Sequence, residues 1–214
     1  DTNPLVAGRG IRILRQHGIR VHLGLLRQEA HEMNEDFFWS VQNKRAWITC
    51  KLGMTLDGRI ADSAGQSKWI THKKARVFVH DLRRRHAGIA VGAATLMADN
   101  PRLTVRHVGG VSPCRFVFSS NPLIGRNTHF RRTAREIRSV LVCPGKNAGE
   151  KQAARDGVEI WYTGPHHSQQ HLKTFSSMAY DEGLTSVMVE GGGELASSFL
   201  ETGMVNRLYL FYGN

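Results

Sequence analysis

The sequence predicts an α/β fold in which helices cover both faces of one sheet. From Ala46 onward, short apolar runs rich in valine and isoleucine alternate with segments of helical periodicity, which is the pattern of strand–helix–strand units. Glycine, proline, asparagine and aspartate gather between these runs and mark the turns. Hydrophobic residues make up 41% of the 214 residues and charged residues 22%, so a disordered chain and a fibrous architecture are excluded.

The first 38 residues predict a separate, incomplete unit. It contains a helix over residues 8–17, a short strand over 19–23 and a second helix that ends near Asn34. Such a unit is too small to bury a core of its own. We therefore expect residues 1–39 to be the C-terminal remnant of a preceding domain, joined by a polar linker over 40–45 to a main domain over 46–214.

The elements of the main domain follow from its apolar periodicity. Strands are expected over residues 47–52, 89–91, 103–105, 115–118, 140–143, 158–162, 187–190 and 207–212. Helices are expected over residues 73–85, around 96–97, over 146–156, over 169–182 and from the glycines at 191–193 to residue 201. Thr71 is the expected N-cap of the helix over 73–85, because its hydroxyl can accept a bond from a free backbone N–H.

The net charge of +11 comes from 29 lysines and arginines against 18 acidic residues and predicts anionic partners. Residues 68–106 carry a net charge of +7 and residues 126–155 a net charge of +6. Neither segment is interleaved with aromatic residues for base stacking, and neither is a disordered basic tail. The charge alone therefore leaves nucleic acid, phosphorylated metabolites and a solvated surface open.

The cysteines and the hydropathy predict a cytoplasmic protein with no membrane partner. Cys50, Cys114 and Cys143 are far apart and odd in number, which is not the pattern of a disulfide framework and favours a reducing compartment. The longest uncharged apolar stretch, residues 87–98, is shorter than the about 20 residues that a membrane-spanning helix needs. The histidines of residues 166–171 have no cysteine or carboxylate at metal-binding spacing, so no metal site is expected.

A glycine-rich turn carries the clearest chemical signal. The strand over residues 187–190 leads into Gly191, Gly192 and Gly193, which open a helix. Glycines let backbone N–H groups approach a phosphate, and the helix N-terminus adds a favourable dipole, although simple loop geometry is an open alternative. The pattern is not G-x-G-x-x-G, so a standard Rossmann domain is not expected. Glu190 lies where open α/β sheets bind ligands, or is merely an exposed carboxylate at a strand end.

Several charged residues are candidates for a site. Lys51 interrupts an apolar strand, which is costly unless its ammonium reaches a cleft or water. Arg83 and Arg106 can bind a phosphate through paired hydrogen bonds, although each taken alone fits a surface charge as well. Thr95 and Asp99 are four residues apart and share a helix face.

Four segments together resemble one family. They are KLGMTLDGRIA, GQSKWIT, VGAATLMADNPRLTVR and VEGGGELASSFL. In this order and spacing they resemble the reductase domain of the bifunctional riboflavin-biosynthesis deaminase/reductase, over residues 40–214. The resemblance implies a dihydrofolate-reductase-like sheet, mixed but mostly parallel, with helices on both faces. It also implies that residues 1–39 are the tail of a cytidine-deaminase-like domain whose zinc ligands lie upstream, and that the C-terminal end of the reductase domain is missing.

The same resemblance implies NADPH-dependent reduction of 5-amino-6-(5-phosphoribosylamino)uracil, with hydride delivered to C1 of the opened ribose. Lys51 and Glu190 would be catalytic, polarising the sugar and relaying a proton. The substrate would contact Ser67, Arg83, Leu103, Arg106 and Glu190. The cofactor would contact Gly53, Trp69, Thr95, Asp99, Ser120, Gly192, Gly193, Glu194, Leu195, Ala196, Ser197 and Ser198.

The expected partners are the phosphorylated substrate and a second copy of the chain, which would form a homodimer through the reductase domain, with no nucleic acid. One alternative is a related reductase that acts on another pterin or aminopyrimidine. The other is a basic nucleic-acid-binding module, for which binding would fall steeply with salt. Whether Asp57 or Glu190 handles protons is open, and the basic segment over 126–155 has no functional explanation.

Overall fold

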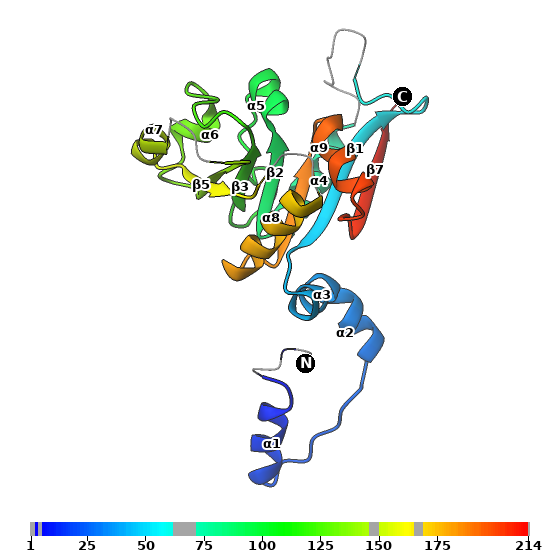
Figure 1. The fold of residues 1–214 in the computed structure, drawn as a ribbon. Helices are drawn as coiled ribbons and strands as arrows, with labels where there is room; N and C mark the ends of the chain where they lie inside the picture. Colours follow the sequence, from blue (N-terminus) through cyan, green and yellow to red (C-terminus); the bar gives the residue numbers. More distant parts are fainter. Residues whose placement is uncertain (1–2, 4–5, 62–71, 146–149, 165–168, 214) are drawn as a thin grey trace.

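A seven-stranded parallel sheet forms the centre of the molecule in the computed structural model, which describes residues 3, 6–61, 72–145, 150–164 and 169–213 (Figure 1). The strands are β1 (Trp47–Thr55), β2 (Gly88–Gly92), β3 (Cys114–Phe118), β4 (Ser139–Cys143), β5 (Glu159–Tyr162), β6 (Ser186–Glu190) and β7 (Arg207–Gly213). Their order is β5-β4-β3-β2-β6-β1-β7, and each pair is parallel. The α/β prediction is confirmed, and the expected mixed character is not found among the strands described.

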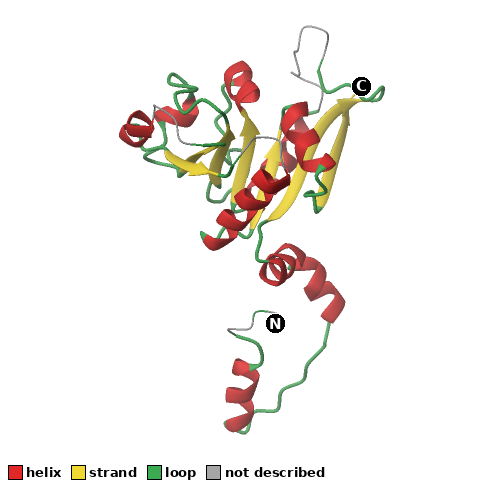
Figure 2. Cartoon of the chain, in the orientation of Figure 1, coloured by secondary structure: helices red, strands yellow, loops and turns green. Residues whose placement is uncertain are grey.

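Helices cover both faces of this sheet, as predicted (Figure 2). The described helices are α1 (Arg9–Gln16), α2 (Arg27–Met33), α3 (Glu35–Asn43), α4 (Lys73–Arg85), α5 (Ala93–Asp99), α6 (His129–Arg132), α7 (Glu150–Arg155), α8 (Gln169–Asp181) and α9 (Gly193–Glu201), of which α4 to α9 cover the sheet. Within the described ranges, no helix is both long enough and apolar enough to cross a membrane.

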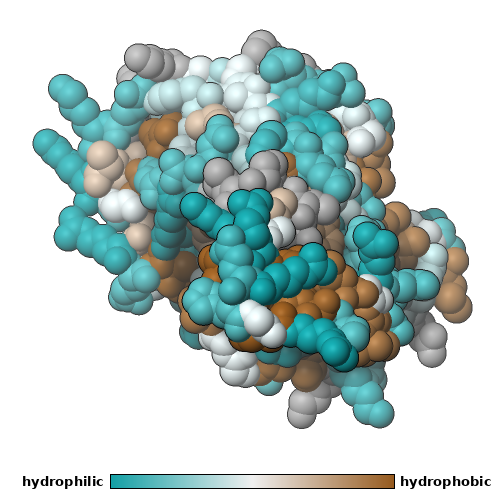
Figure 3. Space-filling model, turned by 90° about the horizontal axis from the view of Figure 1, so that it is seen from below, coloured by the Kyte–Doolittle hydropathy of each residue, from teal (hydrophilic) through white to brown (hydrophobic). Residues whose placement is uncertain are grey.

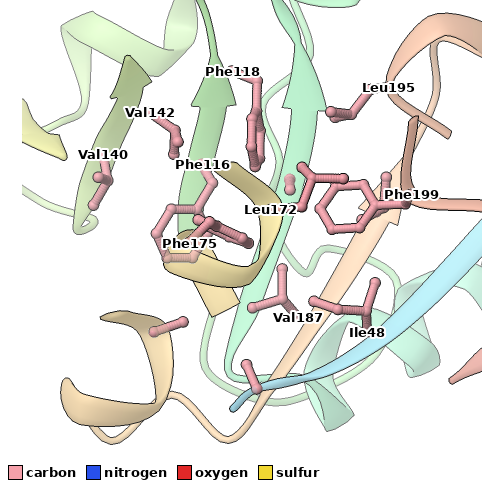
Figure 4. Packing of buried hydrophobic residues seen from close by; sticks show 14 of the residues in the cluster. Ile48, Phe116, Phe118, Val140, Val142, Leu172, Phe175, Val187, Leu195 and Phe199 are labelled. Carbon is pink, nitrogen blue, oxygen red and sulfur yellow. The ribbon is translucent and has the colours of Figure 1, made fainter. Parts of the chain in front are cut away.

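The aromatic part of the core lies between the sheet and the helices α8 and α9 (Figure 4). Side chains alternate between the two faces of a strand, so Phe116 and Phe118 of β3 point to the same face. Phe116 packs edge-on against Phe175 of α8, with ring centroids 5.0 Å apart, and Phe118 packs against Phe199 of α9 at 5.9 Å. Full burial of each such ring stabilises the fold by about 1.5–3 kcal/mol.

The opposite face of the sheet is covered by α4, α5, α6 and α7. Val117, the residue between the two β3 phenylalanines, packs there with Leu96 of α5, Phe130 of α6 and Ala153 of α7. The α4 side chains pack separately on β6, where Leu82 contacts the cluster around Met188. This placement brings the basic face of α4 next to the carboxyl end of β6.

The N-terminal segment lies apart from the sheet (Figure 1). Helices α1 and α2 bury none of their side chains, and the predicted strand over 19–23 is wrong because those residues form irregular structure without a strand partner among the described residues. Apolar side chains such as Leu25 and Met33 are 87% and 83% exposed, and brown surface gathers on this end of the molecule (Figure 3). The predicted linker over 40–45 is also wrong, because α3 extends to Asn43 and buries Ser40.

A second difference concerns the segment after α5. The predicted strand over 103–105 is wrong, since Leu103 has a φ of 54° and Asn100 a φ of 41°, values that no strand accommodates. The Leu103 side chain is 1% exposed and fills the core. The segment therefore leaves α5 as an irregular loop, fixed at Leu103 by its buried side chain.

The N-cap of α4 is not the residue expected from the sequence. The expected N-cap, Thr71, lies outside the described residues, and His72 is the N-cap, accepting a hydrogen bond from the Lys74 N–H at 3.4 Å. Likewise, helix α7 is described from Glu150, so the first four residues of the predicted helix over 146–156 are not described.

Part of the basic segment over 126–155 has a structural explanation. Arg131 is 3% exposed, and its guanidinium donates to Asp156 at 2.6 Å. Arg138 pairs with Glu159 at 2.8 Å and with Glu182 at 2.9 Å, which joins β4, β5 and the end of α8. Two of the arginines of this segment are thus committed to contacts within the fold.

Candidate active site

A cleft runs along the carboxyl ends of β1, β2, β3 and β6, the edge of an open α/β sheet at which ligands bind. It consists of three adjoining cavities, which we call distal, central and basic, with volumes of about 160, 310 and 590 Å³. Thr95 of α5 lines all three of them. The cleft can therefore hold an extended ligand and a second molecule beside it.

The distal and central cavities contain most of the residues expected to bind the cofactor. The distal cavity is lined by Thr95, Ser119, Ser120, His171, Gly192, Glu194, Leu195 and Ser198, among others. The central cavity is lined by Lys51, Gly53, Ile60, Thr95, Asp99, Gly191, Gly192 and Gly193, among others. Ala196 is 2% exposed in the core and Ser197 is exposed, and neither is among the lining residues. Trp69 lies outside the described residues.

The glycine turn between β6 and α9 packs against α5. Gly191 and Gly192 both have a φ of 73°, in the left-handed region that side chains disfavour. A Cβ at Gly192 would lie 2.8 Å from Thr95 Oγ1, which is too close for a real contact. The turn therefore needs glycine for both its conformation and its approach to α5, and this leaves backbone groups bare at the N-terminus of α9.

The basic cavity contains the residues expected to bind the substrate. Among its lining residues are Lys51, Arg83, Leu103, Arg106 and Glu190. Ser67 lies outside the described residues. Leu103 also belongs to the core, where it is 1% exposed.

Among the lining residues of this cavity that were not expected from the sequence, three have polar side chains: Asn100, Arg102 and His129. Asn100 Oδ1 accepts a hydrogen bond from the His129 N–H at 2.8 Å, which joins the end of α5 to α6. Arg102 precedes Leu103 in the segment already quoted for the family resemblance, so its position in that segment could have indicated that it lines the site. No local pattern marks His129, which reaches the cleft only through the tertiary fold.

Arg83 and Glu190 form a closely matched ion pair at the inner end of the basic cavity. Arg83 Nε donates to Glu190 Oε1 at 2.6 Å, and Nη2 donates to Oε2 at 2.8 Å. The third guanidinium nitrogen, Nη1, donates to the Thr104 carbonyl at 3.1 Å. The side chains are only 12% and 9% exposed. Arg83 thus orients Glu190. Arg106, the other arginine of the expected phosphate clamp, lines the cavity and has no hydrogen bond to a carboxylate within the part of the chain that the structure describes.

The charges around Glu190 keep it ionised. Burial alone would raise the pKa of Glu190, but the charge and hydrogen bonds of Arg83, together with the charge of Lys51, hold the pKa below its ordinary value. At neutral pH, Glu190 is therefore a carboxylate that accepts hydrogen bonds and does not supply a proton. Within the described residues, no three histidine, cysteine or carboxylate side chains are placed to hold a metal ion.

Lys51 is the neighbouring cation. The register of the parallel sheet pairs Lys51 of β1 with Glu190 of β6, so the two residues reach the same edge of the sheet. Lys51 Nζ lies 5.8 Å from the ring centroid of Phe211, and the residue lines both the central and the basic cavity. Asp57 is exposed in the turn after β1, where it accepts a hydrogen bond from Thr55, and it is not among the residues that line the cleft. Of the two carboxylates considered for proton handling, Glu190 lines the basic cavity and Asp57 does not.

A parallel sheet between two helical layers, with a ligand cleft at its carboxyl edge, defines the class of the protein: an α/β domain with a dihydrofolate-reductase-like fold. A family model described as the RibD C-terminal domain matches residues 46–213, and the chain belongs to that family.

Curated relatives are similar in sequence to nearly the whole of this chain. The riboflavin biosynthesis protein RibD of Synechocystis is 43% identical over 217 residues, and that of Actinobacillus pleuropneumoniae is 36% identical over 212 residues. Each match covers 99% of this chain and 56% of the relative, so the chain spans about half the length of the curated relatives it matches. The crystal structure of a diaminohydroxyphosphoribosylaminopyrimidine deaminase/5-amino-6-(5-phosphoribosylamino)uracil reductase from Thermotoga maritima is similar, with a TM-score of 0.84 and 32% identity, covering 99% of this chain and 57% of that one.

Proposed function

We propose that this chain forms the reductase part of a riboflavin-biosynthesis enzyme, and that it reduces 5-amino-6-(5-phosphoribosylamino)uracil to the ribitylamino compound with NADPH. The observation that carries the proposal is the juxtaposition in one cleft of a glycine turn at a helix N-terminus and a basic cavity that contains Lys51, Arg106 and the Arg83–Glu190 pair. The similarity to RibD proteins and to the Thermotoga maritima reductase supports the same substrate.

The residues of the distal and central cavities fit a nicotinamide dinucleotide. Bare backbone at Gly192, beside the first turn of α9, suits a phosphate, and the shape of the turn excludes a side chain there. Gly53, Thr95 and Asp99 would hold the part of the cofactor nearest to Lys51. When bound, NADPH supplies the hydride, and the protein supplies orientation and electrostatics.

The residues of the basic cavity suit the reduction of a phosphorylated sugar. Arg106 is placed to bind the phosphate through charge-assisted hydrogen bonds. Glu190, held ionised by Arg83, accepts a hydrogen bond from the substrate and fixes its orientation. Reduction of the opened imine at C1 requires one proton for each hydride, and Lys51 is the proton donor beside the reacting atoms.

The substitution Arg106→Ala is expected to raise the KM for the phosphorylated substrate by about 10- to 100-fold, since a hydrogen bond to a charged group contributes about 1.5–3 kcal/mol. The value of kcat should change much less, because the phosphate is remote from the reacting carbon. Steady-state kinetics at fixed, saturating NADPH measure both. Arg132→Ala, an exposed arginine of α6 that is not among the lining residues, is the control. An unchanged KM in Arg106→Ala would exclude the phosphate role.

The substitution Gly192→Ala is expected to weaken NADPH binding by at least about tenfold, because it adds the cost of left-handed backbone, about 1–2 kcal/mol, to a clash with Thr95 Oγ1. Titration of cofactor binding by calorimetry measures the Kd. Gly203→Ala is the matched control, since Gly203 also has a positive φ, of 66°, but a Cβ there meets nothing within 4 Å. Equal Kd values in the two variants would contradict the assigned cofactor turn.

The reaction itself is tested by NADPH oxidation at 340 nm with the full-length parent protein and the phosphoribosylaminouracil. Turnover supports the proposal, and its absence would contradict it. A phosphorylated substrate is favoured over an unphosphorylated pterin because the basic cavity contains Arg102 and Arg106. Salt-dependent binding of DNA or RNA would instead support the nucleic-acid alternative.

The proposal includes a homodimer formed through the reductase domain, and it assigns residues 1–39 to a preceding domain. Exposed apolar side chains on the edge strand β7, Leu208 at 42% and Tyr212 at 58%, support contact with further protein at this edge of the sheet. The exposed apolar surface of α1 and α2 supports the view that residues 1–39 are the tail of a deaminase domain. Sedimentation of the full-length parent, as a dimer or a monomer, tests the dimer.

A further inference from the structure

His80 is a buried histidine that the proposed reaction does not use. It lies on α4, one helical turn before Arg83, and is 5% exposed. Its Nδ1 accepts a hydrogen bond from the backbone N–H of Arg106 at 3.2 Å. A buried imidazole therefore contacts the backbone of the residue whose side chain faces the basic cavity.

The hydrogen bond determines the protonation state of the ring. Because Nδ1 accepts from a backbone N–H, it carries no proton, and the neutral ring has its proton on Nε2. The surroundings of the ring also favour its neutral form. Burial, followed by the charges of Arg83, Arg106 and His107, lowers the pKa of His80 to about 4, whereas the charge of Glu190 acts to raise it. His107 packs edge-on against the ring, with centroids 4.5 Å apart. At neutral pH, His80 is thus a permanent hydrogen-bond acceptor.

The segment that contains Arg106 is irregular and depends on α4 for its position. Besides the ring contact of His107, two hydrogen bonds tie the segment to this helix, one from the Arg106 N–H to His80 and one from Arg83 Nη1 to the Thr104 carbonyl. Arg106 Nη1 in turn donates to Thr104 Oγ1 at 3.0 Å. The helix that orients Glu190 through Arg83 therefore also places the backbone of Arg106 through His80.

We propose that His80 is a positioning residue, which holds Arg106 where its guanidinium meets the phosphate of the substrate. The inference rests on the proposed function for the identity of that phosphate. Neither the family resemblance nor the residues expected from the sequence include His80. Its role is to reduce the freedom of the loop before the substrate binds, so its loss should affect substrate affinity and not the chemical step.

The test compares two substitutions in the full-length protein. His80→Phe keeps an aromatic ring but removes the acceptor, and should raise the KM for the phosphorylated substrate about three- to tenfold, the effect of one ordinary hydrogen bond, with kcat within about twofold. His80→Asn offers Oδ1 as an acceptor and should restore KM to within about twofold of the wild type. Hydrogen exchange at the Arg106 amide should be faster in His80→Phe than in His80→Asn.

His86→Phe is the control for a structural role. His86 ends the same helix and contacts the Leu82 carbonyl and Thr49 Oγ1, away from the cleft. It should lower the Tm without changing KM. A wild-type KM in His80→Phe, or an equal rise in KM in His80→Asn, would overturn the inference.

Failure of the proposed function can be told apart from failure of this inference. If the wild type reduces nothing, the proposed reaction is wrong, and the affinity for ribose 5-phosphate, measured by calorimetry, then tests His80. The inference expects weaker binding of this probe to His80→Phe than to the wild type and to His80→Asn. Equal affinity in all three proteins would contradict it.

Discussion

Glu190→Gln is expected to lower the kcat of the reductase by about 10²-fold or more, because the substrate loses the charged acceptor that orients it and a small misplacement of the reacting atoms can cost that much. The glutamine has nearly the same shape, but it cannot accept two charge-assisted hydrogen bonds from Arg83 or keep a negative charge beside the sugar. NADPH binding should persist, since Glu190 lines the basic cavity and not the distal one. Steady-state kinetics and cofactor titration measure the two effects separately.

The same substitution should also destabilise the fold, and this must be distinguished from the loss of chemistry. Removing one partner of a buried pair costs about 3–5 kcal/mol, because Arg83 is left without a counter-charge. The double substitution Arg83→Met with Glu190→Gln should recover much of that stability and none of the turnover. Glu182→Gln, in an exposed pair with Arg138, is the matched control with a cost of less than about 1 kcal/mol. Normal turnover in Glu190→Gln would remove Glu190 from the mechanism.

Lys51→Met is the second large effect, an expected loss of about 10²–10⁴-fold in kcat. Methionine keeps the length and the apolar stem of the side chain but removes the ammonium, the proposed proton donor. The folded structure should be little affected, because the substitution keeps the apolar stem and removes only the ammonium, whose Nζ lies 5.8 Å from the Phe211 ring centroid. Single-turnover kinetics, with substrate and NADPH both bound, measure the chemical step directly.

The control for Lys51→Met is Lys151→Met, in which an exposed lysine of α7 is changed far from the cleft. It should have the kinetics of the wild type. If Lys51→Met retained a kcat within a few-fold of the wild type, the proton would have to come from another group or from water, and Lys51 would be reduced to a binding role.

Local patterns were sufficient for most of the fold. Apolar runs bounded by turn residues predicted β2, β3, β4 and β6 to within one residue at each end. The glycines after β6 predicted the start of α9 because a strand that ends at a glycine turn leaves few other conformations. In each case, the pattern that predicts the element lies within the residues that form it.

The failures concern positions where tertiary contacts override local preference. Residues 103–105 have the composition of a strand, but burial of Leu103 in the core fixes a positive φ instead. In residues 19–23, apolar side chains alternate with Arg20 and His22, but no strand lies beside them in the structure described, and so they form no sheet. Both errors come from assigning a strand on local composition without knowing whether a neighbouring strand is present.

The site was predicted as a set of residues and not as an arrangement. Arg83 and Glu190 are 107 residues apart, and no local pattern shows that they bond to each other. The sequence suggested a clamp of two arginines, but the geometry ties Arg83 to Glu190 and leaves Arg106 facing the cavity. Ion pairs between residues far apart in the sequence determine which charged side chains remain available to bind a ligand.

Transfer of the hydride to C1 of the ribose is the central claim, and isotope labelling tests it most directly. The full-length parent is incubated with the phosphoribosylaminouracil and NADPH that carries deuterium at the transferable C4 position. We expect a ribitylamino product one mass unit heavier, with the deuterium at C1 of the side chain by nuclear magnetic resonance. Product without deuterium, or with deuterium on the pyrimidine ring, would contradict the reaction proposed for this cleft.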